Sequence, residues 1–88
     1  MRRFNASGII GSIELAGPGE VSEIIFDDGS KAYIEEPELR QLKTAFGSLE
    51  GSLGKSILYV TSRVSKIICG LQPTDMYAFD RLLKSLER

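Results

Sequence analysis

The sequence contains no histidine and no tryptophan, and it has a single cysteine among its 88 residues. Without histidine the chain lacks the commonest general base and the commonest metal ligand, which excludes Ser-His, Cys-His and His-zinc sites. The one cysteine, Cys69, excludes a disulfide within the chain. Because its neighbours in the sequence are apolar, we expect Cys69 to be a small buried side chain and not a reactive thiol.

Long apolar runs are absent as well, since the longest, residues 57–60, has four residues. A membrane-spanning helix needs about 20 apolar residues. No apolar segment of the kind found in secretory signals follows the basic start Met1-Arg2-Arg3. The sequence therefore predicts a soluble, cytoplasmic protein with no membrane partner.

Charge is small in total and uneven along the chain. The net charge is −1, yet residues 14–38 hold eight acidic residues and one basic residue, whereas residues 39–88 hold eight basic and four acidic residues. The small total argues against a general nucleic-acid binder, which usually has a strongly basic domain. If the two segments do not interleave in the fold, they predict one acidic face and one basic face.

The first 35 residues have the pattern of an antiparallel meander. Apolar and polar residues alternate over residues 8–15, which predicts a half-buried strand, and Gly17-Pro18-Gly19 predicts a turn. Residues 21–27 and 30–35 are rich in β-branched and aromatic residues, and Asp28-Gly29 between them is a strong hairpin signal.

The register of this hairpin predicts a sheet that is apolar on both faces. A two-residue loop at Asp28-Gly29 would pair Ile25 with Ala32 and Ile24 with Tyr33. Large apolar side chains would then lie on both faces of the sheet. In a sheet with one solvent-exposed face, apolar and polar side chains should instead alternate along each strand. We therefore expect either a second copy of the chain over one face or closure of the sheet into a barrel. The candidate interface residues are Ile24, Phe26 and Tyr33.

A helix should follow the meander. Glu36-Pro37-Glu38 is typical of a helix start, because proline suits the first turn and acids suit the positive end of the helix dipole. Leu39, Leu42 and Phe46 form one apolar stripe at helical spacing. Residues 47–54 hold three Gly and two Ser, so we expect most of that segment to be a loop.

The last third predicts two strands and a helix. β-Branched residues favour strands at 56–62 and 64–70 with a turn near Ser62-Arg63, although a single helix over the same residues stays open as an alternative. Thr74 is a candidate cap for a helix that runs to the end of the chain. Its predicted buried stripe consists of Met76, Phe79, Leu83 and Leu86, and Leu82 widens it.

The hairpin at residues 24–30, followed by Pro37-Glu38-Leu39, resembles a hairpin of SH3-like barrels. The resemblance implies a small barrel and transfers no functional residue. Together these elements predict a single domain over residues 1–88 with an α+β fold. Its expected form is a small, mainly antiparallel five-stranded sheet or half-barrel of order β-β-β-α-β-β-α with two helices.

Two motifs invite a chemical interpretation. Residues 51–56, Gly-Ser-Leu-Gly-Lys-Ser, resemble a phosphate loop, but the first glycine of that motif would have to occupy the position of Leu49. A plain loop at 47–56 with Lys55 is still able to bind a small anionic group. The acidic residues lack the spacing of a calcium loop. The sequence therefore predicts no catalytic residue, no metal and no cofactor.

These observations favour a non-catalytic protein-interaction module, such as an adaptor, inhibitor or regulatory subunit, that is a homodimer. One alternative is weak nucleic-acid binding by the basic C-terminal half. The other is binding of a small anion by the 47–56 loop. The candidate anion or partner contacts are Lys55, Arg63, Lys66, Arg81, Lys84 and Arg88.

Overall fold

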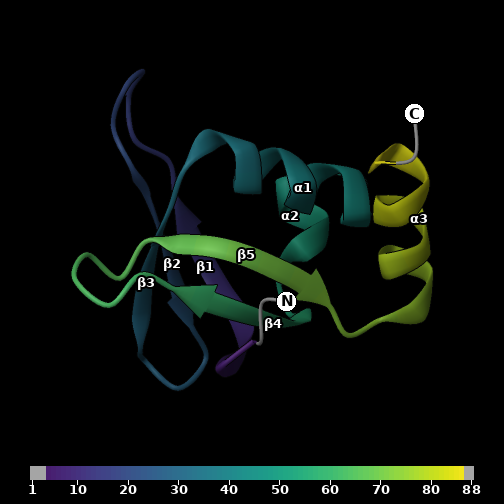
Figure 1. Cartoon of the computed structure of the whole chain (residues 1–88), viewed down its shortest axis with the longest axis horizontal. Coiled ribbons are helices and arrows are strands. Elements are labelled where there is room, and N and C mark those ends of the chain that lie inside the picture. Colours follow the sequence, from purple (N-terminus) through teal and green to yellow (C-terminus); the bar gives the residue numbers. More distant parts are fainter. Residues whose placement is uncertain (1–3, 87–88) are drawn as a thin grey trace.

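A computed structural model of the chain describes residues 4–86. Its first three strands, β1 (Ala6–Glu14), β2 (Ser22–Phe26) and β3 (Lys31–Ile34), form the predicted meander. Helices α1 (Glu36–Phe46) and α2 (Leu49–Ser52) lead to strands β4 (Ser56–Thr61) and β5 (Ile68–Pro73), and helix α3 (Met76–Leu86) comes last (Figure 1). The α+β fold with a five-stranded antiparallel sheet is confirmed, and α2 is a short helix that the sequence did not predict.

The sheet has the strand order β3-β2-β1-β4-β5, and all neighbouring strands are antiparallel. β1 is the shared strand, because residues 6–9 pair with β4 and residues 10–14 pair with β2. The two edge strands meet where the amide of Tyr33 donates to the carbonyl of Lys66 over 3.1 Å, beside a parallel bridge to Ile67. The sheet is thus a partly closed barrel. A helix, α1, lies between β3 and β4 in the chain.

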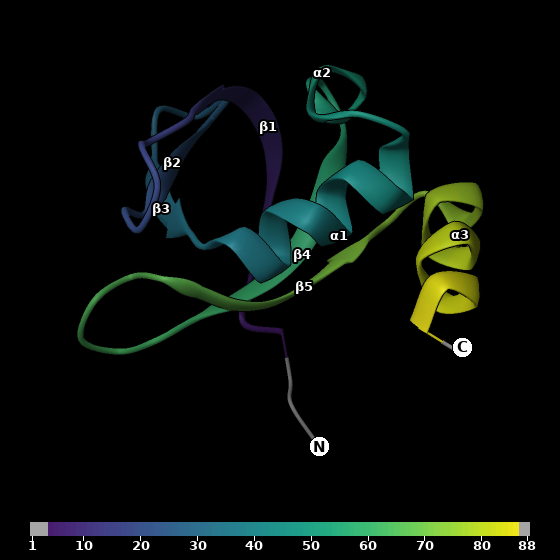
Figure 2. The ribbon, with the colours of Figure 1, turned by 90° about the horizontal axis from the view of Figure 1, so that it is seen from above.

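Helix α1 covers the gap that the barrel leaves between β3 and β5. Seen from above, α1 crosses over β5 and lies between the β2–β3 hairpin and α3 (Figure 2). Its buried residues are Leu39, Leu42 and Ala45. The first two join the barrel core, whereas Ala45 packs against α3. The predicted helix start at Glu36-Pro37-Glu38 is confirmed, and α1 ends at Phe46.

The β2–β3 hairpin has a different register from the one predicted. The amide of Phe26 donates to the carbonyl of Ser30 over 2.8 Å, and the amide of Gly29 donates to the carbonyl of Phe26 over 2.9 Å. The loop therefore has three residues, and Gly29 takes the left-handed conformation at its end with φ 88°. The Asp28 carboxylate accepts from the amide of Ser30 over 2.9 Å and holds this turn. The predicted two-residue loop is wrong by one residue.

This shift exchanges the cross-strand partners and gives the hairpin one buried face. Ile24 now pairs with Ala32, and Glu23 pairs with Tyr33. Ile24 and Phe26 therefore lie in the core and cannot form the predicted interface, whereas Tyr33 is 40% exposed on the outer face. The two-sided apolar sheet behind the homodimer prediction is absent. The homodimer itself stays a prediction.

The β4–β5 pair confirms two strands and excludes the helix alternative, but the turn is wider than predicted. β4 ends at Thr61 and β5 begins at Ile68, so residues 62–67 form the connection. This loop is closed by a hydrogen bond from the amide of Ser62 to the carbonyl of Ile67, 2.9 Å long. In the displaced strand Cys69 faces outward and is exposed, so the expectation of a buried thiol is wrong.

Helix α3 packs through only one edge of its predicted apolar face, because Leu82 is the one predicted residue that is buried. Its cap is Asp75, whose carboxylate accepts from the amide of Tyr77 over 2.8 Å, and not Thr74. The buried residues of α3 are Ala78 and Leu82, which pack against α1 and not into the barrel. The predicted stripe of Met76, Phe79, Leu83 and Leu86 is half-buried at Phe79 and exposed at the other three positions.

The contact between α3 and α1 yields a direct test. Leu82 is 4% exposed and Leu83 is 40% exposed. We expect Leu82→Ala to lower the free energy of unfolding by about 2–4 kcal/mol, because it removes a buried side chain. Leu83→Ala should cost less than about 1 kcal/mol. Urea denaturation of both variants measures the difference, and an equal loss would contradict the packing of α3.

A second test concerns the approach of β1 to the core. A Cβ atom at Gly8 would lie 2.6 Å from the Phe26 ring, and that ring is buried and stacked on Tyr59 with centroids 4.9 Å apart. We expect Gly8→Ala to cost about 1–3 kcal/mol through overpacking. Gly17→Ala has open space around its Cβ and should stay within about 0.5 kcal/mol of the wild type. Melting curves of the two variants provide the comparison.

Candidate functional site

The loop between β1 and β2 is held in a defined conformation by hydrogen bonds. Gly17, Pro18, Gly19 and Glu20 form a turn in which the amide of Glu20 donates to the carbonyl of Gly17 over 3.1 Å. Pro18 and the positive φ of Gly19, 81°, suit the second and third positions of a type II turn. The buried hydroxyl of Ser22 accepts from the amide of Ala16 over 3.1 Å and fastens the base of the loop.

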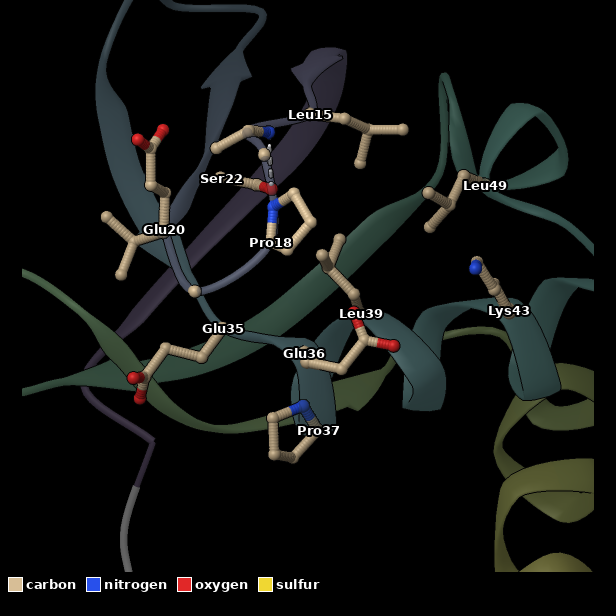
Figure 3. A pocket seen from close by; sticks show the side chains of 14 residues that line it. Leu15, Pro18, Glu20, Ser22, Glu35, Glu36, Pro37, Leu39, Lys43 and Leu49 are labelled. Carbon is tan, nitrogen blue, oxygen red and sulfur yellow. Dashed lines mark hydrogen bonds between the residues drawn. The ribbon is translucent and has the colours of Figure 1, made fainter.

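This loop and α1 enclose a groove of about 640 Å³. Leu15 and Pro18 of the loop, Leu39 of α1 and Leu49 of α2 lie toward one another across it (Figure 3). Leu15 is 65% exposed, which is unusual for a leucine beside a core. The groove thus offers an apolar floor to a binding partner.

A smaller hollow of about 290 Å³ adjoins the groove beside Leu49. Leu15 and Leu49 line both spaces, and Ile13 and the exposed Leu53 extend the apolar surface. We call the two spaces together the loop–helix groove. Its length favours an extended or helical segment over a compact small molecule.

Carboxylates border the loop–helix groove. Glu20, Glu35 and Glu36 line it, and the side chains of Glu20 and Glu35 point outward from its rim (Figure 3). Glu36 is paired with Arg40 at 3.5 Å on the surface. Lys43 is the one basic residue among the described residues that line the larger space. Three of the eight acidic residues of 14–38 therefore lie at this groove, and the other five do not line it.

Helix α2 fixes the far wall of the groove. The hydroxyl of Ser48 accepts from the amide of Gly51 over 2.9 Å and caps the turn. The amide of Gly54 donates to the carbonyl of Ile10 over 2.7 Å, which ties the segment to β1. Residues 49–52 of the expected loop thus form a helical turn, and its position brings Leu49 and Leu53 to the groove.

The predicted basic contacts do not come together. Arg63 and Lys66 lie in the β4–β5 loop, whereas Arg81 and Lys84 lie on α3 at the opposite end of the molecule (Figure 1). Lys84 is also paired with Asp80 at 3.1 Å. Lys55 is exposed just before β4, in the segment tied to β1. Arg88 lies outside the described residues. No common basic face unites these described residues.

A hollow of about 260 Å³ lies at the barrel end away from α1. Lys31, Lys66 and Tyr59 are among its lining residues. Burial raises the pKa of Tyr59, and the Asp28 carboxylate adds to this shift. Hydrogen bonds from the side chain and amide of Ser30 lower the pKa of Asp28 and keep it charged. Lys31 is already paired with Glu23 at 3.7 Å, so nearby carboxylates offset the positive charge of this hollow.

Comparison with known proteins adds no functional assignment. A scan against protein-family models, a search of curated proteins and a search of solved structures gave no match to this chain. Within residues 4–86, no helix has both the length and the apolar character that crossing a membrane requires.

The apolar residues of the groove were not among the candidates predicted from the sequence. Leu15 and Val21 flank the Gly-Pro-Gly turn, and the apolar Leu49 and Leu53 lie in a Gly/Ser-rich segment. The sequence signal that could have indicated the groove was apolar residues beside strong turn signals, because exposed loops are usually polar. Their meeting across α1 depends on the fold and has no local signal.

The capping of α2 gives a test of the groove wall. We expect Ser48→Ala to lower the free energy of unfolding by about 0.5–2 kcal/mol through loss of the cap. Amide exchange at Gly51 should accelerate, because its hydrogen-bond acceptor is removed. Hydrogen-exchange mass spectrometry measures both effects. Unchanged exchange at Gly51 would contradict the role of Ser48.

Proposed function

We propose that this protein is a non-catalytic interaction module that binds a partner-protein segment in the loop–helix groove. The segment carries apolar side chains for the floor of the groove and lysine or arginine side chains for its rim. The observation that carries the proposal is the combination of an exposed apolar floor at Leu15 with the carboxylates of Glu20 and Glu35 around it.

The construction of the groove supports this assignment. Ser22 fastens the β1–β2 loop, and Ser48 caps α2, so both walls are held before a partner arrives. A preformed surface lowers the conformational entropy lost on binding. Carboxylates at the rim attract basic side chains through long-range electrostatics and select against acidic partners.

Absence of enzymatic activity is part of the proposal. The sequence has no histidine. The hydroxyl of Ser22 is buried at the base of the loop, where it accepts a backbone hydrogen bond. The carboxylates of Glu20 and Glu35 point out from the rim, not toward a shared reacting position (Figure 3). We place the module in the cytoplasm, and the exposed thiol of Cys69 supports a reducing compartment.

Nucleic-acid binding is the weaker proposal for this fold. Other five-stranded, partly open barrels, those of the OB-fold, bind oligonucleotides on the face of their second and third strands and on the loops that border it. Here that face pairs Lys31 with Glu23, and its β1–β2 loop carries Glu20. Fold analogy alone does not assign function. Retention on heparin at low salt, with elution only as the salt concentration rises, would support the weaker proposal against ours.

A selection experiment tests the groove. Random displayed peptides of about 12 residues are selected on the immobilised protein. We expect enriched peptides to combine leucine, isoleucine or phenylalanine with lysine or arginine. Fluorescence polarisation should show that Glu20→Lys/Glu35→Lys weakens their binding by about tenfold or more. Raising the salt concentration should weaken binding to the wild type.

The matched control is Asp80→Lys, which reverses one charge on α3 at a distance from the groove. This variant should bind the selected peptides like the wild type. Enrichment of acidic peptides would overturn the proposal, as would binding that survives in the double groove variant.

A further inference from the structure

The larger space of the loop–helix groove holds unpaired charges of both signs. Glu20 and Glu35 line it, and neither is in an ion pair within the described part of the chain. Lys43 lines it too and is likewise in no ion pair among the described residues. Glu36 differs, because Arg40 holds its carboxylate at 3.5 Å. Two carboxylates and one ammonium are therefore left to interact with a partner.

Helix α1 sets the separation between these charges. Glu36 and Lys43 are seven residues apart, so they share one side of the helix and are separated by about 10 Å along its axis. Glu35 comes directly before the helix. In the close-up Glu20 and Glu35 lie on one side of the space, whereas Lys43 lies on the other side, near Leu49 (Figure 3). Charges of opposite sign thus stand at opposite ends of the larger space.

Apolar side chains fill the interval between the two ends. Leu39 shares the side of α1 that carries Glu36 and Lys43, and it lies between them along the helix. Leu15 and Pro18 face Leu39 from the β1–β2 loop (Figure 3). A segment that crosses this interval meets carboxylates first, then an apolar surface and then an ammonium.

The sign of the charge changes again at the smaller space. Glu50 lines that space beside Leu49 and does not line the larger one. A negatively charged group of a partner is therefore attracted to Lys43 and repelled beyond Leu49. Its favoured position is the Lys43 end of the larger space.

We propose, on the basis of the proposed function, that the segment bound in the loop–helix groove carries a carboxylate that faces Lys43. Its basic residues face Glu20 and Glu35, and its apolar side chains lie between the two kinds of charge. Because an extended chain advances about 3.3 Å per residue, at least about three residues separate the carboxylate from the nearest basic residue. Lys43 is thus the residue that selects the order of charges in the partner.

The order of charges distinguishes segments that have the same net charge. A carboxylate placed beside the basic residues meets Glu20 and Glu35, which repel it, and leaves Lys43 without a partner. An exposed ion pair alone changes affinity only about two- to fivefold. Exchanging an attraction for a repulsion should therefore change affinity by about threefold to tenfold.

Fluorescence polarisation with two variants of a groove-selected peptide tests the order of charges. Each variant has an amidated C-terminus and a single aspartate, placed either beyond the apolar residues or beside the basic ones. The composition and net charge of the two peptides are identical. We expect the peptide with the distant aspartate to bind the wild type about threefold to tenfold more tightly.

Reversal of the charge at Lys43 tests the residue itself. Lys43→Glu should weaken binding of the peptide with the distant aspartate by about threefold to tenfold. A lysine in place of that aspartate should restore binding to this variant. The matched control is Arg81→Glu, which makes the same change of charge on α3, a helix of which no described residue lines either space. It should bind like the wild type, and melting curves check that both variants are folded.

The carboxylate can belong to a side chain or to the C-terminus of the segment. Peptides that end at the Lys43 position, in the free-acid and amide forms, separate these two sources. Tighter binding of the free acid, lost in Lys43→Glu, identifies the C-terminal carboxylate.

Equal affinity of the wild type for the two aspartate peptides would overturn the charge order, as would a Lys43→Glu variant that binds both like the wild type. If Glu20→Lys/Glu35→Lys still weakens binding in that case, the proposed function stands and only the charge order fails. Peptides that bind equally well to the Glu20→Lys/Glu35→Lys and Lys43→Glu variants would overturn both.

Discussion

The close approach of β1 to β2 is the constraint on which the barrel depends. At Gly8 the Phe26 ring occupies the space of a side chain, and at Gly11 a Cβ would lie 3.0 Å from the carbonyl oxygen of Ile25. The register of the two strands shifts between Ile10 and Ser12, at this same point. A bulge of this kind increases local twist, which lets one strand pair with β4 at one end and with β2 at the other. The core forms inside that bend, with Phe26 stacked on Tyr59.

The β2–β3 hairpin shows what a local turn signal can predict and what it cannot. Asp28-Gly29 predicted a hairpin at the right place, and the two strands are present. The sequence could not distinguish a two-residue loop from a three-residue loop, because a glycine in the left-handed conformation suits both. The deciding interactions are the hydrogen bonds from Ser30 to Asp28 and the burial of Ile24 with Ala32. A register shift of one residue replaced the predicted hairpin, apolar on both faces, by a hairpin with one buried face.

Helices α1 and α3 were predicted in type and place, whereas α2 was not. Periodicity identifies the apolar side of a helix, which was sufficient for Leu39 and Leu42 because α1 lies directly on the barrel. On α3 the same pattern marked an apolar arc without telling which part meets α1. The structure uses Ala78 and Leu82 for that contact. Similarly, the acidic character of residues 14–38 could be predicted from the sequence. The groove also requires Leu49, which the tertiary fold brings beside those residues.

The distribution of charge limits which partners suit the loop–helix groove. Glu20, Glu35 and Glu36 line it, and Lys43 is the one basic residue among the described residues of its larger space. Two copies of this surface would therefore repel each other, so a second groove is not a suitable partner. A segment of another protein with basic side chains beside apolar ones meets both requirements of the proposed site, because its charges oppose those of the rim and its apolar side chains replace water on Leu15.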